Sequence, residues 1–170
     1  MVEQADVDVT LFRALSFAAR QLTAVIEEEL KVHAGVSLPE FDILSALYAA
    51  PDRRARAGEL GYMLAWEKSR LSHQVSRMER KGLIERVLCE SDQRGTWVAL
   101  TDSGAAAVDR AVPAYQAAVS AQLGGVAATE SGADLARQIL AIALPVSPDS
   151  CRGELATLAA TLDDAAAASR

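Results

Sequence analysis

The sequence predicts a mainly α-helical protein with one small β-hairpin near its middle. Apolar side chains recur at helical spacing on both sides of that hairpin, over residues 8–32 and again beyond residue 103. Hydrophobic residues make up 51% of the chain and aromatic residues only 5%, and most of the apolar residues are the helix-favouring alanine and leucine. Two short segments, residues 84–89 and 96–100, instead carry the β-branched and aromatic side chains that strands prefer.

Two helices are predicted in the N-terminal third of the chain. The first covers residues 8–32, where leucines and other apolar residues follow a helical period. Ser37 then has the residue type of an N-cap, and Glu40 follows three residues later, as in a capping box. Pro39 is tolerated in a first helical turn, so a second helix is expected after Ser37, ending before Pro51.

A short helix, a turn and a longer helix are predicted next, over residues 57–64, 65–67 and 68–81. Gly82 suits the left-handed position that follows a helix C-terminus. The basic residues just before it suit the negative end of the helix dipole. This order gives two helices joined by a tight turn.

The strand segments 84–89 and 96–100 flank the polar loop ESDQRG, which predicts a hairpin. Three helices are expected after it, over residues 103–123, 129–144 and 150–168. Gly124 and Gly125 are expected to break the chain between the first two, because glycine disfavours helix interiors.

Charge is distributed unevenly along the 170 residues. The formal net charge is −6, but the window from Arg53 to Arg94 holds ten basic and six acidic residues, a net charge of +4. The rest of the chain therefore carries a net charge of −10. A polyanion would be attracted to the middle of the chain and repelled by both flanks, which favours one docking direction.

The helix at residues 68–81 has two unlike faces. Leu71, Val75 and Met78 share the face that is expected to pack inward. The opposite face combines cations, which suit phosphates, with short hydrogen-bonding groups, which suit base edges. Its members are Ser69, Arg70, His73, Ser76, Arg77 and Arg80.

A helix-turn-helix followed by a hairpin is the order of a winged helix-turn-helix, in which the second helix enters the major groove of DNA. At the hairpin tip, Arg94 is a cation that could enter the minor groove, and Asp92 is close enough in sequence to hold it. A solvated basic surface without function is the simpler alternative, but it leaves the order of these elements unexplained.

The segments SLPEFDILSAL, GELGYML, SRLSHQVSRMERKGLIER and CESDQRGTWVALTDSG resemble the MarR family of winged-helix transcriptional regulators. The resemblance covers about residues 11–144. It implies a homodimer with intertwined N- and C-terminal helices, a near-palindromic operator, and often release from DNA by a small aromatic ligand. The residues matching the family's DNA contacts are Ser69, Arg70, Ser72, His73, Ser76, Arg77 and Arg94.

This chain departs from the family pattern at three places. His73 stands where many relatives have arginine, and Trp66 stands at a turn position that is often small and polar. The segment after Pro145 extends beyond the usual end. The expected domains are an N-terminal dimerisation helix (1–35), a DNA-binding domain (36–101) and C-terminal dimerisation helices with a tail (102–170).

The expected function is sequence-specific binding of double-stranded DNA by a homodimeric regulator, a ligand-responsive repressor. The alternative is a winged-helix module whose basic face docks an acidic protein. An enzyme is not expected, because His33 and His73 are the only histidines and no histidine or cysteine pair has zinc-ligand spacing. We therefore expect no metal and no cofactor. With neither a signal-like start nor a run of roughly 20 apolar residues, a cytoplasmic protein without a membrane span is expected.

Two further features have alternative interpretations. The aromatic residues Phe12, Phe17, Tyr48 and Trp66 could line a pocket for an aromatic effector, although aromatics at such spacing are more often core residues. Cys89 could sense oxidants, but a small buried side chain on a strand is the simpler interpretation.

Overall fold

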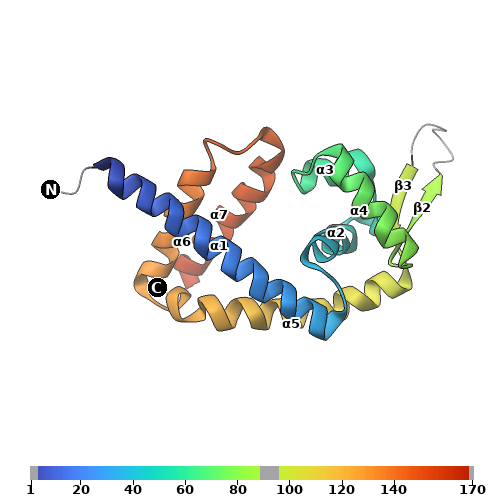
Figure 1. Cartoon of the computed structure of the whole chain (residues 1–170), viewed down its shortest axis with the longest axis horizontal. Helices are drawn as coiled ribbons and strands as arrows, with labels where there is room; N and C mark the ends of the chain where they lie inside the picture. Colours follow the sequence, from blue (N-terminus) through green and yellow to red (C-terminus); the bar gives the residue numbers. More distant parts are fainter. Residues whose placement is uncertain (1–3, 89–95, 169–170) are drawn as a thin grey trace.

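The structure is a computed structural model that describes residues 4–88 and 96–168. It confirms a mainly helical chain with a small antiparallel sheet (Figure 1). The helices are α1 (Gln4–Ala34), α2 (Leu38–Ala49), η1 (Pro51–Arg53), α3 (Ala57–Met63), α4 (Lys68–Arg80), α5 (Asp102–Ala127), α6 (Glu130–Ala143), η2 (Asp149–Cys151) and α7 (Arg152–Ala168). The strands are β1 (Arg54–Arg56), β2 (Ile84–Leu88) and β3 (Thr96–Leu100).

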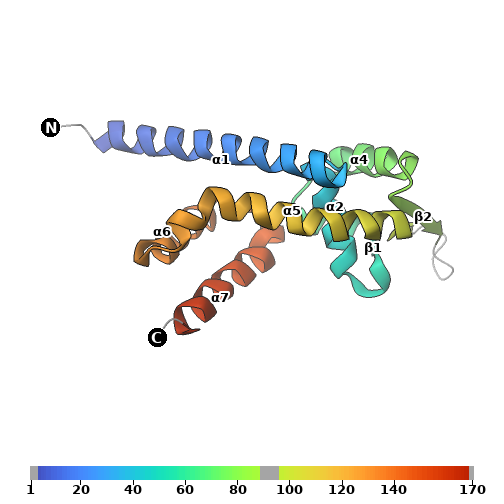
Figure 2. The ribbon, with the colours of Figure 1, turned by 90° about the horizontal axis from the view of Figure 1, so that it is seen from below.

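The long helices α1 and α5 lie side by side and connect the two ends of the molecule (Figures 1 and 2). The C-terminal part of α1 is buried at Leu30 and Ala34, and α5 contributes Ala107, Val108 and Ala111 to the same core. Small alanine side chains allow α1 and α5 to approach each other closely. The domain that runs from α2 to β3 packs on this pair, which we call the α1–α5 base.

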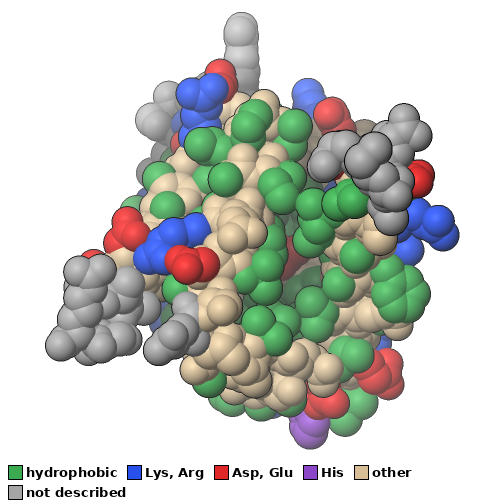
Figure 3. Space-filling view, turned by 90° about the vertical axis from the view of Figure 1, so that its left-hand side faces the viewer, with side chains coloured by type: hydrophobic (Ala, Val, Ile, Leu, Met, Phe, Trp, Pro, Cys, Tyr) green, Lys and Arg blue, Asp and Glu red, His purple; other side chains and the backbone are tan. Residues whose placement is uncertain are grey.

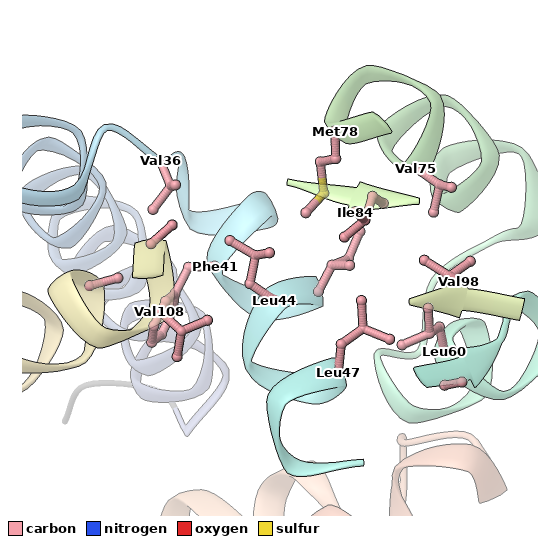
Figure 4. Packing of buried hydrophobic residues seen from close by; sticks show 14 of the residues in the cluster. Val36, Phe41, Leu44, Leu47, Leu60, Val75, Met78, Ile84, Val98 and Val108 are labelled. Carbon is pink, nitrogen blue, oxygen red and sulfur yellow. The ribbon is translucent and has the colours of Figure 1, made fainter. Parts of the chain in front are cut away.

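The hydrophobic core of that domain is centred on α2. Leu44 and Leu47 point toward residues of α3, α4 and the sheet, as Figure 4 shows. Phe41 of α2 faces Val108 of α5, and its ring stacks on Tyr115 with centroids 5.0 Å apart. One helix thus joins the helix-turn-helix to the α1–α5 base, so the position of α4 depends on the packing of α2.

The sheet has three strands in the order β1-β3-β2, all antiparallel to their neighbours. The hairpin strands β2 and β3 lie where the sequence predicts them, paired from Ile84 opposite Leu100 to Leu88 opposite Thr96. Strand β1 is an addition that the sequence analysis missed. It is three residues long with two arginines, so it has no recognisable alternation and forms only because β3 offers a free edge.

Capping residues fix the ends of two helices. The Ser37 N–H donates to Glu40 Oε2 at 2.9 Å, which confirms the predicted capping box of α2. Thr101 caps α5 by accepting from the Gly104 N–H at 3.0 Å, and its own hydroxyl donates to the Gly82 carbonyl at 2.7 Å. Gly82 has φ +69°, the left-handed conformation expected for it. These bonds tie the end of α4 to the start of α5.

The predicted break at Gly124 and Gly125 is wrong, because α5 continues through both to Ala127. Neither glycine has a positive φ, and helix-favouring residues flank them. Two glycines cost a helix only about 2 kcal/mol, which cooperative propagation across a 26-residue helix can absorb. The chain turns instead at Ala128, and α6 begins at Glu130, one residue after the predicted start, with Thr129 as its N-cap.

By length and composition alone, the part of α1 from Asp6 to Ala34 could cross a membrane, although the sequence analysis expected no such span. Arg13 and Arg20 interrupt it and are exposed in the structure. Each arginine would cost about 2.5–3.5 kcal/mol at the centre of a bilayer.

The C-terminal segment folds back toward the helix-turn-helix. The Tyr62 hydroxyl of α3 donates to the Asp149 carbonyl of η2 at 3.3 Å. The connection between α6 and α7 therefore lies close to α3 (Figure 1).

Candidate nucleic-acid interface

The turn between α3 and α4 is held by backbone geometry. The Trp66 N–H donates to the Gly61 carbonyl at 2.9 Å, and the Leu64 N–H donates to the Leu60 carbonyl at 3.0 Å. Ala65 has φ +50°, an uncommon conformation that makes the reversal tight. The two helices therefore form a compact helix-turn-helix unit.

Helix α4 has the two faces that the sequence predicts. Leu71, Val75 and Met78 are buried in the core. Five of the six α4 residues that were matched to DNA contacts are exposed: Ser69, Arg70, Ser72, His73 and Arg77. Their cations and short hydroxyls form one solvent-facing surface with nothing of the described chain lying over it.

Ser76 differs from the other five. It is half-buried, and its Oγ accepts a hydrogen bond from Arg86 Nη2 of β2 at 3.0 Å. Arg86 also forms an ion pair with Glu79, one turn further along α4. The hydroxyl of Ser76 thus links α4 to the sheet as well as lying beside the exposed surface.

Arg86 is a residue whose role the sequence analysis missed. It lies two positions after the buried Ile84, and side chains two apart on a strand share a face. That spacing was a signal that Arg86 points toward α4 and not away from it. Its two bonds fix the angle between α4 and the hairpin.

Glu40 holds the C-terminal end of α4 against α2. Its carboxylate is fully buried, with Lys81 Nζ 2.7 Å and Arg77 Nε 3.8 Å from Oε1. Burial alone would raise the pKa of Glu40, but hydrogen bonds from Lys81 and Ser37 outweigh burial and lower it. Arg77 is therefore restrained from within the protein while its side chain stays 56% exposed.

Arg70 lies in the first turn of α4 against an aromatic ring. Its ζ carbon is 4.0 Å from the centroid of the Trp66 ring. Asp42 of α2 is another charged neighbour. Burial raises the pKa of Asp42 to about 6, the Arg70 charge opposes that rise, and Glu154 of α7 adds to it.

The hairpin tip carries two of the predicted site residues, Arg94 and Asp92, and both lie outside the described residues, as does Cys89. Near the loop end of β3, opposite Val87, Trp97 contacts two cations of β1. The ζ carbons of Arg54 and Arg56 lie 5.1 and 5.0 Å from its ring centroid. Positive charge thus extends from α4 to the outer edge of the sheet.

The four predicted effector residues lie in three different places within one chain. Phe12 and Phe17 are exposed on α1 and line a shallow hollow of that helix. The Tyr48 hydroxyl donates to Asp109 Oδ1 at 3.3 Å, and the Arg53 ζ carbon lies 4.8 Å from the Tyr48 ring centroid. Trp66 lines a separate cavity, to which neither α1 nor α2 contributes.

That cavity has a volume of about 810 Å³ and lies between α3, α4 and the sheet. Its wall is mostly apolar, with Tyr62, Trp66 and Pro148 among the larger side chains. The polar side chains on the same wall are Glu67, Lys68, Ser72, Arg86 and Thr96. This combination of apolar wall and few polar groups is typical of a small-molecule site.

A basic helix exposed beside a three-stranded hairpin sheet, with its opposite face buried, defines a winged helix-turn-helix protein. The exposed cations can neutralise phosphates, and the neighbouring hydroxyls, imidazole and guanidinium can reach base edges.

Comparison with known proteins agrees with this class. A sequence profile of the MarR family matches residues 34–95. AbsC, a MarR family transcriptional regulator from Streptomyces coelicolor, is 30% identical with a TM-score of 0.75, over 83% of this chain and 95% of its own. No curated protein sequence matches.

Two further solved structures contain DNA. Sco3205, a MarR family transcriptional regulator from Streptomyces coelicolor solved in complex with DNA, is 30% identical over 82% of this chain and 88% of its own, with a TM-score of 0.75. A MarR variant from E. coli in complex with operator DNA shares the fold, at 20% identity and a TM-score of 0.70, over 86% and 99% of the two chains. The chain belongs to the MarR family of transcriptional regulators.

Proposed function

We propose that this protein is a cytoplasmic, homodimeric repressor that binds a near-palindromic operator in double-stranded DNA and releases it when a small aromatic ligand binds. The observation that carries the proposal is the exposed face of α4, where Arg70, His73 and Arg77 stand beside hydroxyl groups. Sco3205, which is 30% identical over most of both chains, was solved in complex with DNA. Repression follows where such an operator overlaps a promoter.

In this proposal the work on DNA is divided along α4. Arg70 and His73 lie in the N-terminal half, which usually reaches base edges. Arg77 lies later on α4, where Glu40 restrains it, and is better placed for a phosphate. Ser69, Ser72 and Ser76 supply short polar contacts, and Arg94 reaches the minor groove with support from Asp92.

The homodimer is supported by exposed apolar side chains at the end of the molecule away from the sheet. Figure 3 shows hydrophobic side chains around a hollow on this face. Among the large apolar side chains of α1, α5 and α6, seven are more than 40% exposed: Val9, Phe12, Phe17, Leu123, Leu135, Ile139 and Ile142. A surface this apolar is covered by a partner in most stable proteins. A second copy, adding its own α1, α5 and α6, would cover this surface. In such a dimer, residues 1–35 and 102–170 would form the dimerisation domains and residues 36–101 the DNA-binding domain.

Ligand response is supported by the cavity between α3, α4 and the sheet. A ligand there would touch α4 and Arg86 together. It could therefore change the angle between the helix and the hairpin, on which simultaneous docking in two grooves depends. The wall of this cavity is mostly apolar and includes Trp66 and Tyr62, which favours an aromatic ligand.

The experiment is selection of bound sequences from random duplexes by the full-length protein, followed by affinity measurements at several salt concentrations. We expect a motif with two related half-sites. The alternative function, docking of an acidic protein by the same basic face, predicts no enriched motif. Arg77→Ala provides a further check, because it should weaken selected and unselected duplexes by similar factors.

A further inference from the structure

Trp66 stands in the turn between α3 and α4, on a rigid part of the fold. Its N–H is bonded to Gly61, and a Cβ atom at Gly61 would lie 3.3 Å from the Trp66 carbonyl oxygen. Glycine therefore leaves the room that the turn needs to close. The Trp66 side chain is partly buried and packs against the hydrophobic core. The indole is thus anchored by both its backbone and its packing.

The indole presents a ring face to Arg70, an exposed residue in the first turn of α4. The distance of 4.0 Å from the Arg70 ζ carbon to the ring centroid is well within the range of a cation–π contact. Arginine in particular stacks on aromatic faces, because its guanidinium is planar and weakly hydrated. The contact therefore restricts the torsions of a side chain that would otherwise be free in solvent.

The stack leaves the hydrogen-bonding edge of Arg70 open. A guanidinium that stacks on a ring uses its flat face, whereas its five N–H donors lie in the plane. Within residues 4–88 and 96–168, Arg70 forms no hydrogen bond and no ion pair. Two parallel N–H donors on a guanine edge are the commonest specific contact in the major groove. Arg70 therefore combines a restricted orientation with unused donors.

Asp42 acts on the same guanidinium from α2. The positive charge of Arg70 lowers the pKa of this partly buried carboxyl, against the larger upward effect of burial. The interaction is mutual, so Asp42 attracts Arg70 toward α2. The Trp66 ring therefore restricts Arg70 before DNA arrives, and Asp42 adds an attractive charge from α2.

We propose that Trp66 is a positioning residue that gives Arg70 its base preference, by holding the guanidinium so that its in-plane donors meet the base edges. The inference rests on the DNA-binding function proposed above and adds to it a residue outside α4. Restricting a flexible side chain before binding removes part of the entropy cost of its contact. It also prevents the side chain from turning to satisfy a wrong base, and so increases discrimination.

Trp97 provides a matched control. It too stacks with arginines, but these are Arg54 and Arg56 of the sheet and not residues of α4. Trp97→Phe therefore changes an indole–arginine contact without changing the support of Arg70. It also leaves Trp66 as the only tryptophan of the chain.

The test compares full-length variants on the selected operator, on each of its single base-pair variants and on a scrambled duplex. We expect Trp66→Leu to weaken operator binding by about 3–10-fold and to relax preference at the base pairs that Arg70→Ala relaxes. Affinity for the scrambled duplex and the salt dependence should stay unchanged. Trp66→Phe should retain most of the preference, and Trp66→Leu combined with Arg70→Ala should bind no worse than Arg70→Ala alone.

Two further measurements do not depend on the folding of Trp66→Leu. Arg70→Lys keeps the charge but loses the planar stack, so it should relax the same base pairs. In the Trp97→Phe background, Arg70→Ala should shift the emission of Trp66 in the absence of DNA.

Equal weakening on every duplex, or additive effects in the double variant, would show that Trp66 only stabilises the turn and would overturn the inference. If the wild type prefers an operator and Trp66→Leu keeps that preference in full, the inference about Trp66 is wrong but the proposed DNA-binding function stands. If the wild type prefers no duplex, the proposed function and the inference fail together.

Discussion

At the scale of single residues, Asp42 occupies a site that opposes its ionisation. Burial raises its pKa to about 6 from an ordinary value of 3.8, with Glu154 adding to the rise and Arg70 opposing it. The folded state therefore holds a proton more tightly than the unfolded chain. The protonated form supports folding below pH 4, and that support is lost as the pH rises through about 6.

Asp42→Asn should therefore raise the free energy of unfolding at pH 8 by about 1–2 kcal/mol, a figure reduced from the full shift because Asp42 is partly exposed to solvent. The gain should shrink as the pH falls from about 6 to 4. Urea denaturation at pH 8, 6 and 4.5 measures it. A gain that does not vary with pH would show that ionisation of Asp42 is not the cause.

The sequence predicted correctly those residues whose exposure follows from their position on a single helix. The inward and outward faces of α4 follow from helical spacing, which also predicts the exposure of Ser69, Arg70, His73 and Arg77. Ser72 was predicted only from the family resemblance, and it too is exposed. Arg86, Asp42 and the ion pairs of Glu40 depend on neighbours supplied by other elements. No local pattern contains that information, and for Arg86 only its spacing from Ile84 gave a hint.

At the scale of elements, two glycines of α5 should respond oppositely to substitution. A Cβ atom at Gly104 would collide with the Leu83 carbonyl oxygen and crowd Leu100, whereas Gly125 has nothing within 4 Å. Gly104→Ala should destabilise the protein by about 1–3 kcal/mol through strain. Gly125→Ala should stabilise it by up to about 1 kcal/mol, because alanine favours a helix interior.

Thermal or urea unfolding of both variants measures the pair. If Gly125→Ala were as harmful as Gly104→Ala, the helix would not run through that position as the structure has it. The same comparison explains why the predicted break failed: glycine propensity is a weak local preference, and the flanking helix overrode it. Strand β1 was not predicted because its own residues show no strand pattern. It forms only through pairing with β3.

At the scale of the whole molecule, the apolar end of the structure should hold the dimer together. Ile139 and Ile142 of α6 are 43% and 51% exposed in the single chain. Burying a charge in an apolar interface is costly, so Ile139→Lys should shift the protein toward monomer. Operator affinity should fall with it, because a monomer holds only one half-site.

Sedimentation at micromolar concentration measures this shift. Met63→Lys on α3 is the control, because Met63 is equally exposed, at 44%, but lies on the helix-turn-helix. It should leave the dimer intact. A wild type that sediments as a monomer would contradict the dimer directly.

The most direct test of the central claim, that a dimer of this chain reads DNA sequence through α4, is a salt titration of binding to the selected operator and to a scrambled duplex of equal composition. We predict at least roughly 10³-fold tighter binding to the operator near physiological salt. Log affinity should fall linearly with log salt, and Arg77→Ala should make that slope shallower by about 0.9 for each phosphate that is no longer neutralised, counted twice in a dimer. Equal affinity for the two duplexes, or affinity that does not change with salt, would contradict the claim.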